Sequence, residues 1–389
     1  MSANTPASPT PQQIHWEENG VQHSARWRSE AGMPPPKRVV IADDRTNADV
    51  AYRLACEGTA LLWRGDFQNA RQLLQALARR ADHKSKPAKK AKPAKPPATP
   101  TEAFHLHRQA QSQRARTLAM LLLPFEDGYT LPLRRAPDVQ LACNEAYGRF
   151  EEPFVASLRE LLGVIGAHEW RRTGVEIPAL GARIHPYYGV FSPVRGEYVQ
   201  LVAEAPLPSD TSLAFDIGIG TGVLSAVLAQ RGIKRVVGTD QDQRALSCAR
   251  ENITRLELEQ QIELKVADLF PEGRAPLIVC NPPWVPARPS SAIEHAVYDP
   301  ESRMLRGFLA GLTGHLAPRG EGWLILSDLA EHLGLRPRAE LLAWIEAAGL
   351  KVVDRIDVRP THPRAADASD PLHKARAAEV TSLWRLAAA

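Results

Sequence analysis

The chain has 389 residues, 44% of them hydrophobic and 24% charged, which is an ordinary composition for a globular protein long enough for two domains. No apolar run approaches the ~20 residues of a membrane span, and the polar, proline-rich start has no apolar segment typical of a secretory signal. The cysteines are scattered without a Cys-x-x-Cys pair, at Cys56, Cys143, Cys248 and Cys280. These features favour a cytoplasmic protein with reduced thiols, no metal site and no membrane partner.

The net charge of +4 originates in one segment. Six lysines lie in Lys84–Lys95 with no acidic residue among them, and the rest of the chain carries 42 basic and 44 acidic residues. Such a run can contact a nucleic-acid backbone, and it is equally typical of a solvated linker. Both interpretations stay open.

The sequence of the first half of the chain predicts a small, mainly helical region. Residues 1–40 are rich in Ser, Thr, Pro and Gln and predict a disordered tail. Residues 41–175 are expected to be mainly helical, interrupted by a Lys/Pro-rich linker over 83–100. Expected helices cover parts of 48–80, with Leu61 and Leu62 at helical spacing and Asp66 placed to start a second helix, and also residues 102–123 and 159–172.

From residue 181 onward, short β-like runs alternate with helical stretches. The β-like runs are Leu213–Ile217, Arg235–Thr239, Ile262–Val266, Leu277–Cys280, Trp323–Ser327, Val352–Val358 and Val380–Leu386. The helical stretches are Gly222–Gln230, Asp242–Leu256, Glu301–His315 and Arg338–Ala348. This alternation predicts an α/β domain over 181–389, with a doubly wound, mostly parallel, seven-stranded Rossmann-like sheet.

A glycine-rich loop follows the first of these strands. It contains Asp216, Gly218, Gly220 and Thr221, and a helix comes next. Glycines let the backbone turn sharply and approach a ligand, and ligands bind at the carboxyl ends of such strands. The dinucleotide fingerprint requires a glycine where Val223 stands, and the nucleotide P-loop requires a lysine that is absent. The acid before the first glycine suits a ligand that carries an ammonium group.

Two further acids follow the next two strands. Asp240 can accept both hydroxyls of a ribose, and Asp268 can accept from an adenine amino group while Leu269 or Phe270 covers the ring. A single Asp at a strand end is often only a turn or helix cap. Three acids after three successive strands, the first beside a glycine loop, favour a nucleoside ligand instead.

The most specific motif is Asn281-Pro282-Pro283-Trp284, directly after the fourth apolar run. Two prolines cannot continue a strand ladder, and they stiffen the backbone around Asn281. The side-chain carbonyl of Asn281 and the backbone carbonyl of Pro282 can accept the two hydrogens of a planar NH2 group, and Trp284 offers a flat stacking face. Positioning of a nitrogen next to a methyl donor is the chemistry that this motif suits. The alternative without a catalytic role is a strand that ends at two prolines, with Trp284 as a core residue.

From about Tyr187 onward the chain resembles the class I S-adenosylmethionine-dependent methyltransferases of the Asn-Pro-Pro-aromatic branch. It is similar there to HemK-type protein-glutamine methyltransferases and to "small-domain" ribosomal RNA guanine methyltransferases. The resemblance implies that Asp216, Gly218 and Gly220 bind the methionine part of S-adenosylmethionine, that Asp240 binds its ribose and that Asp268 binds its adenine. It also implies that residues 281–284 hold the target nitrogen.

The resemblance leaves the substrate open between two classes. One is a glutamine side chain of a translation factor or ribosomal protein, and the other is a base amine in RNA or DNA. Two departures bear on this choice: Trp284 replaces the commoner Tyr or Phe, and the segment Gly189–Arg195 lacks the Arg-Pro-Glu-Thr run of the glutamine enzymes. A third hypothesis is a cofactor-binding module without catalysis, against which the intact residues 281–284 argue.

Overall fold

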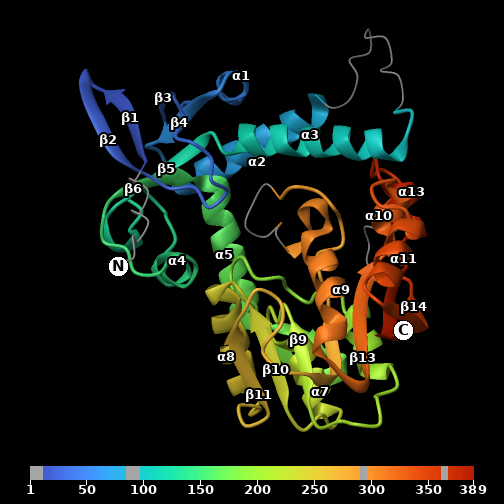
Figure 1. The fold of residues 1–389 in the computed structure, drawn as a ribbon. Helices are drawn as coiled ribbons and strands as arrows, with labels where there is room; N and C mark the ends of the chain where they lie inside the picture. The colour runs from blue at the N-terminus through green and yellow to red at the C-terminus, as the bar shows by residue number, and fades with distance from the viewer. Residues whose placement is uncertain (1–11, 85–96, 290–293, 295, 361–366) are drawn as a thin grey trace, which may run out of the picture. The chain divides into compact units, whose positions relative to one another are not determined.

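The computed structural model describes residues 12–84, 97–289, 294, 296–360 and 367–389 (Figure 1). The chain divides into two compact units. The first unit comprises residues 1–95 and 108–168, and the second comprises residues 96–107 and 169–389. The second unit therefore extends the expected domain of 181–389 by a short preceding stretch and by a segment from the N-terminal half.

The first unit contains a six-stranded mixed sheet. Its strands are β1 (Gln13–Glu18), β2 (Val21–Trp27), β3 (Arg38–Ala42), β4 (Thr59–Trp63), β5 (Leu121–Phe125) and β6 (Phe154–Ser157). They lie in the order β1-β2-β6-β5-β4-β3. The helices of this part of the chain are α1 (Ala48–Cys56), α2 (Phe67–Lys84), α3 (Pro100–Leu118), α4 (Gln140–Tyr147) and α5 (Leu158–Thr173), with α3 and α5 contributing to both units.

The expected disordered tail over residues 1–40 is wrong for the part that the structure describes. Residues 12–40 contain β1, β2 and most of β3, and residues 1–11 lie outside the described residues. The strands β1 and β2 form an antiparallel ribbon in which Ile14 and Trp27 are buried and most other side chains are exposed. Because so few of its side chains are apolar and buried, this ribbon leaves only a faint hydrophobic pattern in the sequence.

The expected helices are present, and helices hold more residues of this region than strands do. Leu61 and Leu62, however, lie in β4 and not in a helix, and every residue of β4 is buried. The end of the helix expected over 102–123 is likewise the strand β5. A fully buried strand gives a continuous apolar run, which spacing alone does not distinguish from a helix.

Two local predictions for this region have different outcomes. The carboxylate of Asp66 accepts from the backbone N–H of Gln68 at 2.8 Å, which confirms that it starts α2. The predicted linker over 83–100 is described only at its ends, where α2 finishes and α3 begins. The lysine run of Lys84–Lys95 lies outside the described residues except for Lys84, the last residue of α2.

The second unit contains the predicted seven-stranded sheet. Its strands are β9 (Ala214–Ile217), β10 (Val236–Asp240), β11 (Ile262–Val266), β12 (Ala275–Cys280), β13 (Leu316–Ser327), β14 (Leu350–Val358) and β15 (Thr381–Ala388). The order is β11-β10-β9-β12-β13-β15-β14, and only β15 runs in the direction opposite to the other six strands. All seven β-like runs of the sequence are therefore confirmed, as is the mostly parallel arrangement.

Helices precede β9 and occupy the connections between these strands, except the connection from β11 to β12, so the sheet is doubly wound (Figure 1). They are α6 (Glu197–Glu204), α7 (Val223–Gln230), α8 (Gln243–Arg255), α9 (Arg303–His315), α10 (Leu329–His332), α11 (Arg338–Ala347) and α13 (His373–Ala378). A short hairpin of β7 (Val175–Ile177) and β8 (Ala182–Ile184) precedes them. The four helices expected from the sequence are α7, α8, α9 and α11.

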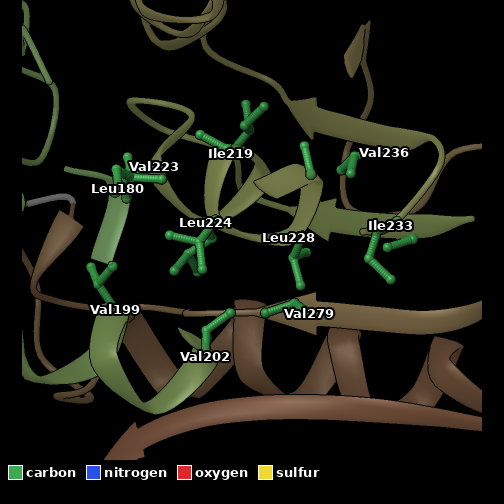
Figure 2. Packing of buried hydrophobic residues seen from close by; sticks show 14 of the residues in the cluster. Leu180, Val199, Val202, Ile219, Val223, Leu224, Leu228, Ile233, Val236 and Val279 are labelled. Carbon is green, nitrogen blue, oxygen red and sulfur yellow. The ribbon is translucent and has the colours of Figure 1, made fainter. Parts of the chain in front are cut away.

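The central strands β9, β10 and β12 are buried on both faces of the sheet. On one face Leu224 and Leu228 of α7 pack with Val199 and Val202 of α6 and with Val279 of β12, as Figure 2 shows. Burial of apolar surface in this layer stabilises the fold by about 25 cal/mol for each Å² removed from water. The alternation of side chains along a strand then sends the neighbours of Val279 to the opposite layer.

In that opposite layer, Ile278 and Cys280 pack with Phe308 of α9 and Ile345 of α11. Because β12 is covered on both sides, all six of its residues are buried. Its carboxyl end at Cys280 is therefore a fixed point from which the following residues emerge. Among the described residues, no helix combines the length and apolar character that crossing a membrane requires.

Candidate active site

The glycine loop connects β9 to α7 at the carboxyl edge of the sheet. Gly218, Gly220 and Gly222 have φ values of +75°, +53° and +84°, in the left-handed region that favours glycine. A Cβ atom at Gly218 would lie 2.7 Å from Cε of Met304, the second residue of α9, so a side chain at this position would require the end of the Met304 side chain to move. At Gly220 the nearest atom to such a Cβ is the carbonyl oxygen of Gly218 at 3.9 Å, so the backbone there borders open space.

Asp216 lies beneath this loop. Its side chain is almost fully buried, and its Oδ2 accepts from the hydroxyl of Ser225 in α7 at 2.7 Å. Burial raises the pKa of Asp216 to about 6, because the charged form loses its hydration. A cationic ligand group near the loop would favour the ionised form.

Asp240 connects the loop to the neighbouring strand. It ends β10, and its Oδ2 accepts from the backbone N–H of Gly220 at 3.2 Å while its Oδ1 accepts from that of Asp242 at 3.0 Å. Burial raises the pKa of Asp240 as well. Since β9 and β10 are paired with Thr239 opposite Ile217, the acid and the loop lie at one edge, as the fold predicts.

Asp268 follows β11 and is exposed, and its Oδ2 accepts from Arg303 of α9 at 2.7 Å. The two apolar residues after it differ in environment. Leu269 is partly buried with a φ of +79°. Phe270 stacks on the rings of Phe308 and His315, with centroids 5.8 and 4.3 Å apart. That packing assigns Phe270 to the core and leaves Leu269 as the candidate to cover a ligand ring.

Residues 281–284 emerge from the buried end of β12, next to the glycine loop. Cys280 is paired with Ile217 of β9, so both segments leave the same edge on adjacent strands. Pro282 is buried, and Asn281, Pro283 and Trp284 are partly buried. The indole Nε1 of Trp284 donates to Oδ1 of Asn281 at 2.8 Å, a contact that the sequence motif does not reveal.

A second set of residues, absent from the sequence prediction, supports Trp284. Arg336 is buried, and it donates to the backbone carbonyl of Trp284 at 3.3 Å and to the hydroxyl of Ser302 at 3.3 Å. Asp299 donates its backbone N–H to the carbonyl of Val285 at 2.9 Å. Its carboxylate accepts from the first backbone N–H groups of α9, so it caps that helix.

Thr221 is buried behind the loop, and its backbone carbonyl accepts from the side chain of Asn252 at 3.0 Å. The structure thus brings Asp216, the glycines, Asp240 and residues 281–284 to one edge of the sheet, and it places Asp268 at the end of β11. Arg336 lies 52 residues from its partner, and no local pattern in the sequence marks it. Across the part of the chain that the structure describes, no group of three or more histidine, cysteine, aspartate or glutamate side chains is placed to hold a metal ion.

Residues 183–329 match the family described as methyltransferase small domain. This part of the chain is similar to the methyltransferases of that family. The match covers the glycine loop, all three acids and residues 281–284, which are the same positions that the geometry brings together or places at successive strand ends. The matched residues include the five strands β9 to β13 of the seven-stranded sheet.

Curated relatives each resemble a part of the chain. The release factor glutamine methyltransferase of Cereibacter sphaeroides is 34% identical over 151 residues, which are 37% of this chain and 50% of the relative. That of Caulobacter vibrioides is 31% identical over 157 residues, 38% of this chain and 54% of the relative. The ribosomal protein L11 methyltransferase of Tolumonas auensis is 26% identical over 137 residues, 35% and 44% of the two chains. The chain spans about half the length of the curated relatives it matches.

Proposed function

We propose that the chain is an S-adenosylmethionine-dependent methyltransferase that methylates the side-chain nitrogen of a glutamine in a protein. The observation that carries the proposal is the emergence of Asn281–Trp284 from β12 directly beside the glycine loop of β9. A ligand on the loop and a target held by Asn281 would then be neighbours. Two relatives of the chain are named as release factor glutamine methyltransferases, which favours glutamine among planar nitrogens.

The residues at the sheet edge fit the cofactor. The open side of Gly220 lets a ligand approach the loop backbone, and the charge of Asp216 under the loop favours the cofactor's ammonium group. Asp240 can accept ribose hydroxyls, and Asp268 can accept from the adenine amino group. When bound, S-adenosylmethionine supplies an electrophilic methyl carbon on a positively charged sulfur.

The chain's own task is then to orient the target nitrogen. An amide nitrogen is a weak nucleophile, because its lone pair is shared with the adjacent carbonyl group. Acceptance of its two hydrogens by Asn281 Oδ1 and by the Pro282 carbonyl would fix the direction of that lone pair and increase the electron density on the nitrogen. The stiffness of the two prolines keeps both acceptors in place, and such positioning supplies most of the rate in reactions of this type.

A base amine in RNA or DNA is the second candidate substrate. The observation that favours it is Trp284, whose indole gives a larger stacking face than the commoner Tyr or Phe. The two candidates share the cofactor site and the two acceptors, so they differ only in the molecule that receives the methyl group.

The test is transfer of tritiated methyl groups from S-adenosylmethionine into a cell lysate, followed by digestion. We expect the label to be lost on protease treatment and to co-migrate with methylated glutamine after complete proteolysis. An Asn281→Ala variant, which should still bind S-adenosylhomocysteine, serves as the matched control. Loss of the label on nuclease treatment would instead support a base amine as the substrate. If the wild-type chain incorporated no more label than Asn281→Ala, methyl transfer at this site would be refuted.

A further inference from the structure

We propose that the indole N–H of Trp284 is a positioning group that fixes the side-chain amide of Asn281 with its oxygen, rather than its NH2 group, available to the target nitrogen. The inference rests on the proposed function and deepens it. It assigns to Trp284 a role through Asn281, in addition to any stacking on the substrate. The distinction matters because only one end of the Asn281 amide can accept a hydrogen bond.

The hydrogen bond itself fixes the orientation of the amide. The indole nitrogen is a donor and never an acceptor, so the Asn281 atom that lies 2.8 Å from Nε1 must be the oxygen. A carbonyl oxygen has two lone pairs, and the indole uses one of them. The second lone pair remains for an N–H of the target. If the amide turned by half a rotation, its NH2 group would face the target amine and donor would oppose donor.

Trp284 can hold Asn281 in this way because its own position is fixed. Its ring packs against apolar side chains of both faces of the sheet and against a third cluster that includes Val285 and Phe104. Its backbone carbonyl accepts from the buried guanidinium of Arg336 at 3.3 Å. Arg336 in turn donates to Ser302, just before α9. The donor is therefore held by tertiary contacts and does not depend on the substrate.

The residue type is specific to this role. Phenylalanine has no donor, and the hydroxyl of tyrosine lies at the far end of the ring, away from the position of the indole nitrogen. In tryptophan the donor Nε1–H belongs to the five-membered ring that is bonded to Cβ, so it lies closer to the backbone than the hydroxyl of tyrosine does. The departure at Trp284 from the commoner Tyr or Phe of the branch thus coincides with a contact that those residues cannot make.

The test compares Trp284→Phe with a matched control, Trp323→Phe. Trp323 is buried in β13, and its Nε1 donates to Glu321 at 3.2 Å, so the control also deletes an indole hydrogen bond from the same unit. The assay is the initial rate of tritiated methyl transfer into the protease-sensitive fraction of a lysate, at saturating S-adenosylmethionine. Calorimetry with S-adenosylhomocysteine measures cofactor binding in each variant.

We expect Trp284→Phe to lower the maximal rate about 10-fold, the effect of losing one neutral hydrogen bond, with unchanged affinity for S-adenosylhomocysteine. Trp323→Phe should keep the maximal rate within about twofold. In the Asn281→Ala background, Trp284→Phe should cause no further loss, because the indole acts through Asn281. An equal loss in both backgrounds, or no loss in either, would overturn the positioning role while leaving the proposed function intact.

A spectroscopic measurement covers the case in which a variant folds poorly. In protein labelled with ¹⁵N-tryptophan, the indole resonance of Trp284 is assigned by its absence from Trp284→Phe. Asn281→Ala should move this resonance toward the position of a free indole N–H and leave that of Trp323 in place. A Trp284 resonance unaffected by Asn281→Ala would show that the bond is absent in solution. A wild-type chain without any methyl transfer would instead refute the proposed function and, with it, the role in positioning.

Discussion

Replacement of Asp216 by asparagine should stabilise the protein while it weakens the cofactor site. The Asp216 carboxyl is buried against Ser225, and its pKa is raised from 3.8 to about 6 in the folded protein. The folded state therefore binds this proton more tightly than the unfolded state does. Asparagine has the same shape, can still accept from Ser225 and carries no charge.

The sign and size of the effect follow from the pKa shift. Below about pH 4 the carboxyl is neutral in both states, and its stabilising contribution is fully present. Between about pH 4 and pH 6 the unfolded state ionises first, so the free energy of unfolding of the wild type falls by ~1.4 kcal/mol for each pH unit. Above about pH 6 the loss is complete at ~3 kcal/mol, for a shift of about two pH units.

The assay is thermal and urea unfolding of the wild type and of Asp216→Asn between pH 4.5 and pH 7.5. The variant should be only ~1 kcal/mol more stable than the wild type at pH 4.5. By pH 7.5 the difference should reach ~3 kcal/mol, or about 6–12 °C in Tm for a unit of this size. Other titrating groups are common to both chains and cancel in the difference. A stability difference that does not change with pH would refute the argument, as would a variant that is less stable at every pH.

The remaining predictions concern other parts of the second unit and one surface thiol. Asp240→Ala should weaken S-adenosylhomocysteine binding about 30-fold, the loss of charge-assisted hydrogen bonds worth ~2 kcal/mol, and an unaltered calorimetric affinity would remove its ribose role. Asp268→Asn should weaken binding less, because this carboxylate is exposed and already paired with Arg303; a larger effect than that of Asp240→Ala would contradict this ranking. Phe104→Ala should lower the free energy of unfolding by about 3–5 kcal/mol, because Phe104 is buried beside Val285 and its removal leaves a cavity; unchanged urea unfolding would argue against that packing. A thiol reagent should modify one cysteine per native chain, the exposed Cys56. Rapid reaction of more than one cysteine would contradict the burial of Cys143, Cys248 and Cys280.

The parts of the candidate site that consist of consecutive residues could be predicted from the sequence. The loop of Gly218 and Gly220 follows a buried strand and precedes a helix, and this order places it at the carboxyl edge of any parallel sheet. The same reasoning placed Asp240 beside it. The contacts of Phe270 could not be predicted, because they depend on α9, which the chain reaches more than thirty residues later.

In the N-terminal half, the strands could not be predicted from the sequence. There the sheet of the first unit consists of short strands, some mostly exposed and others fully buried. In β1 the alternation of apolar and polar residues is limited to Ile14 and Trp16, and β4 is buried at every residue, so neither strand carries a pattern long enough to indicate one buried face. The helices were found because amphipathic helices carry their own period, whereas β1 and β4 are recognisable only beside their partners.

By itself, the sequence determined the seven-stranded α/β domain, the glycine loop and the diproline corner, because each depends on local backbone restraints and on the alternation of strands with helices. The tertiary structure alone decided how Asn281 is oriented. The indole of Trp284 reaches it within the motif, but the burial of Trp284 and its bond from Arg336 come from segments distant in the chain. A hydrogen bond between side chains depends on where packing holds the donor and acceptor, and no spacing along a sequence specifies that.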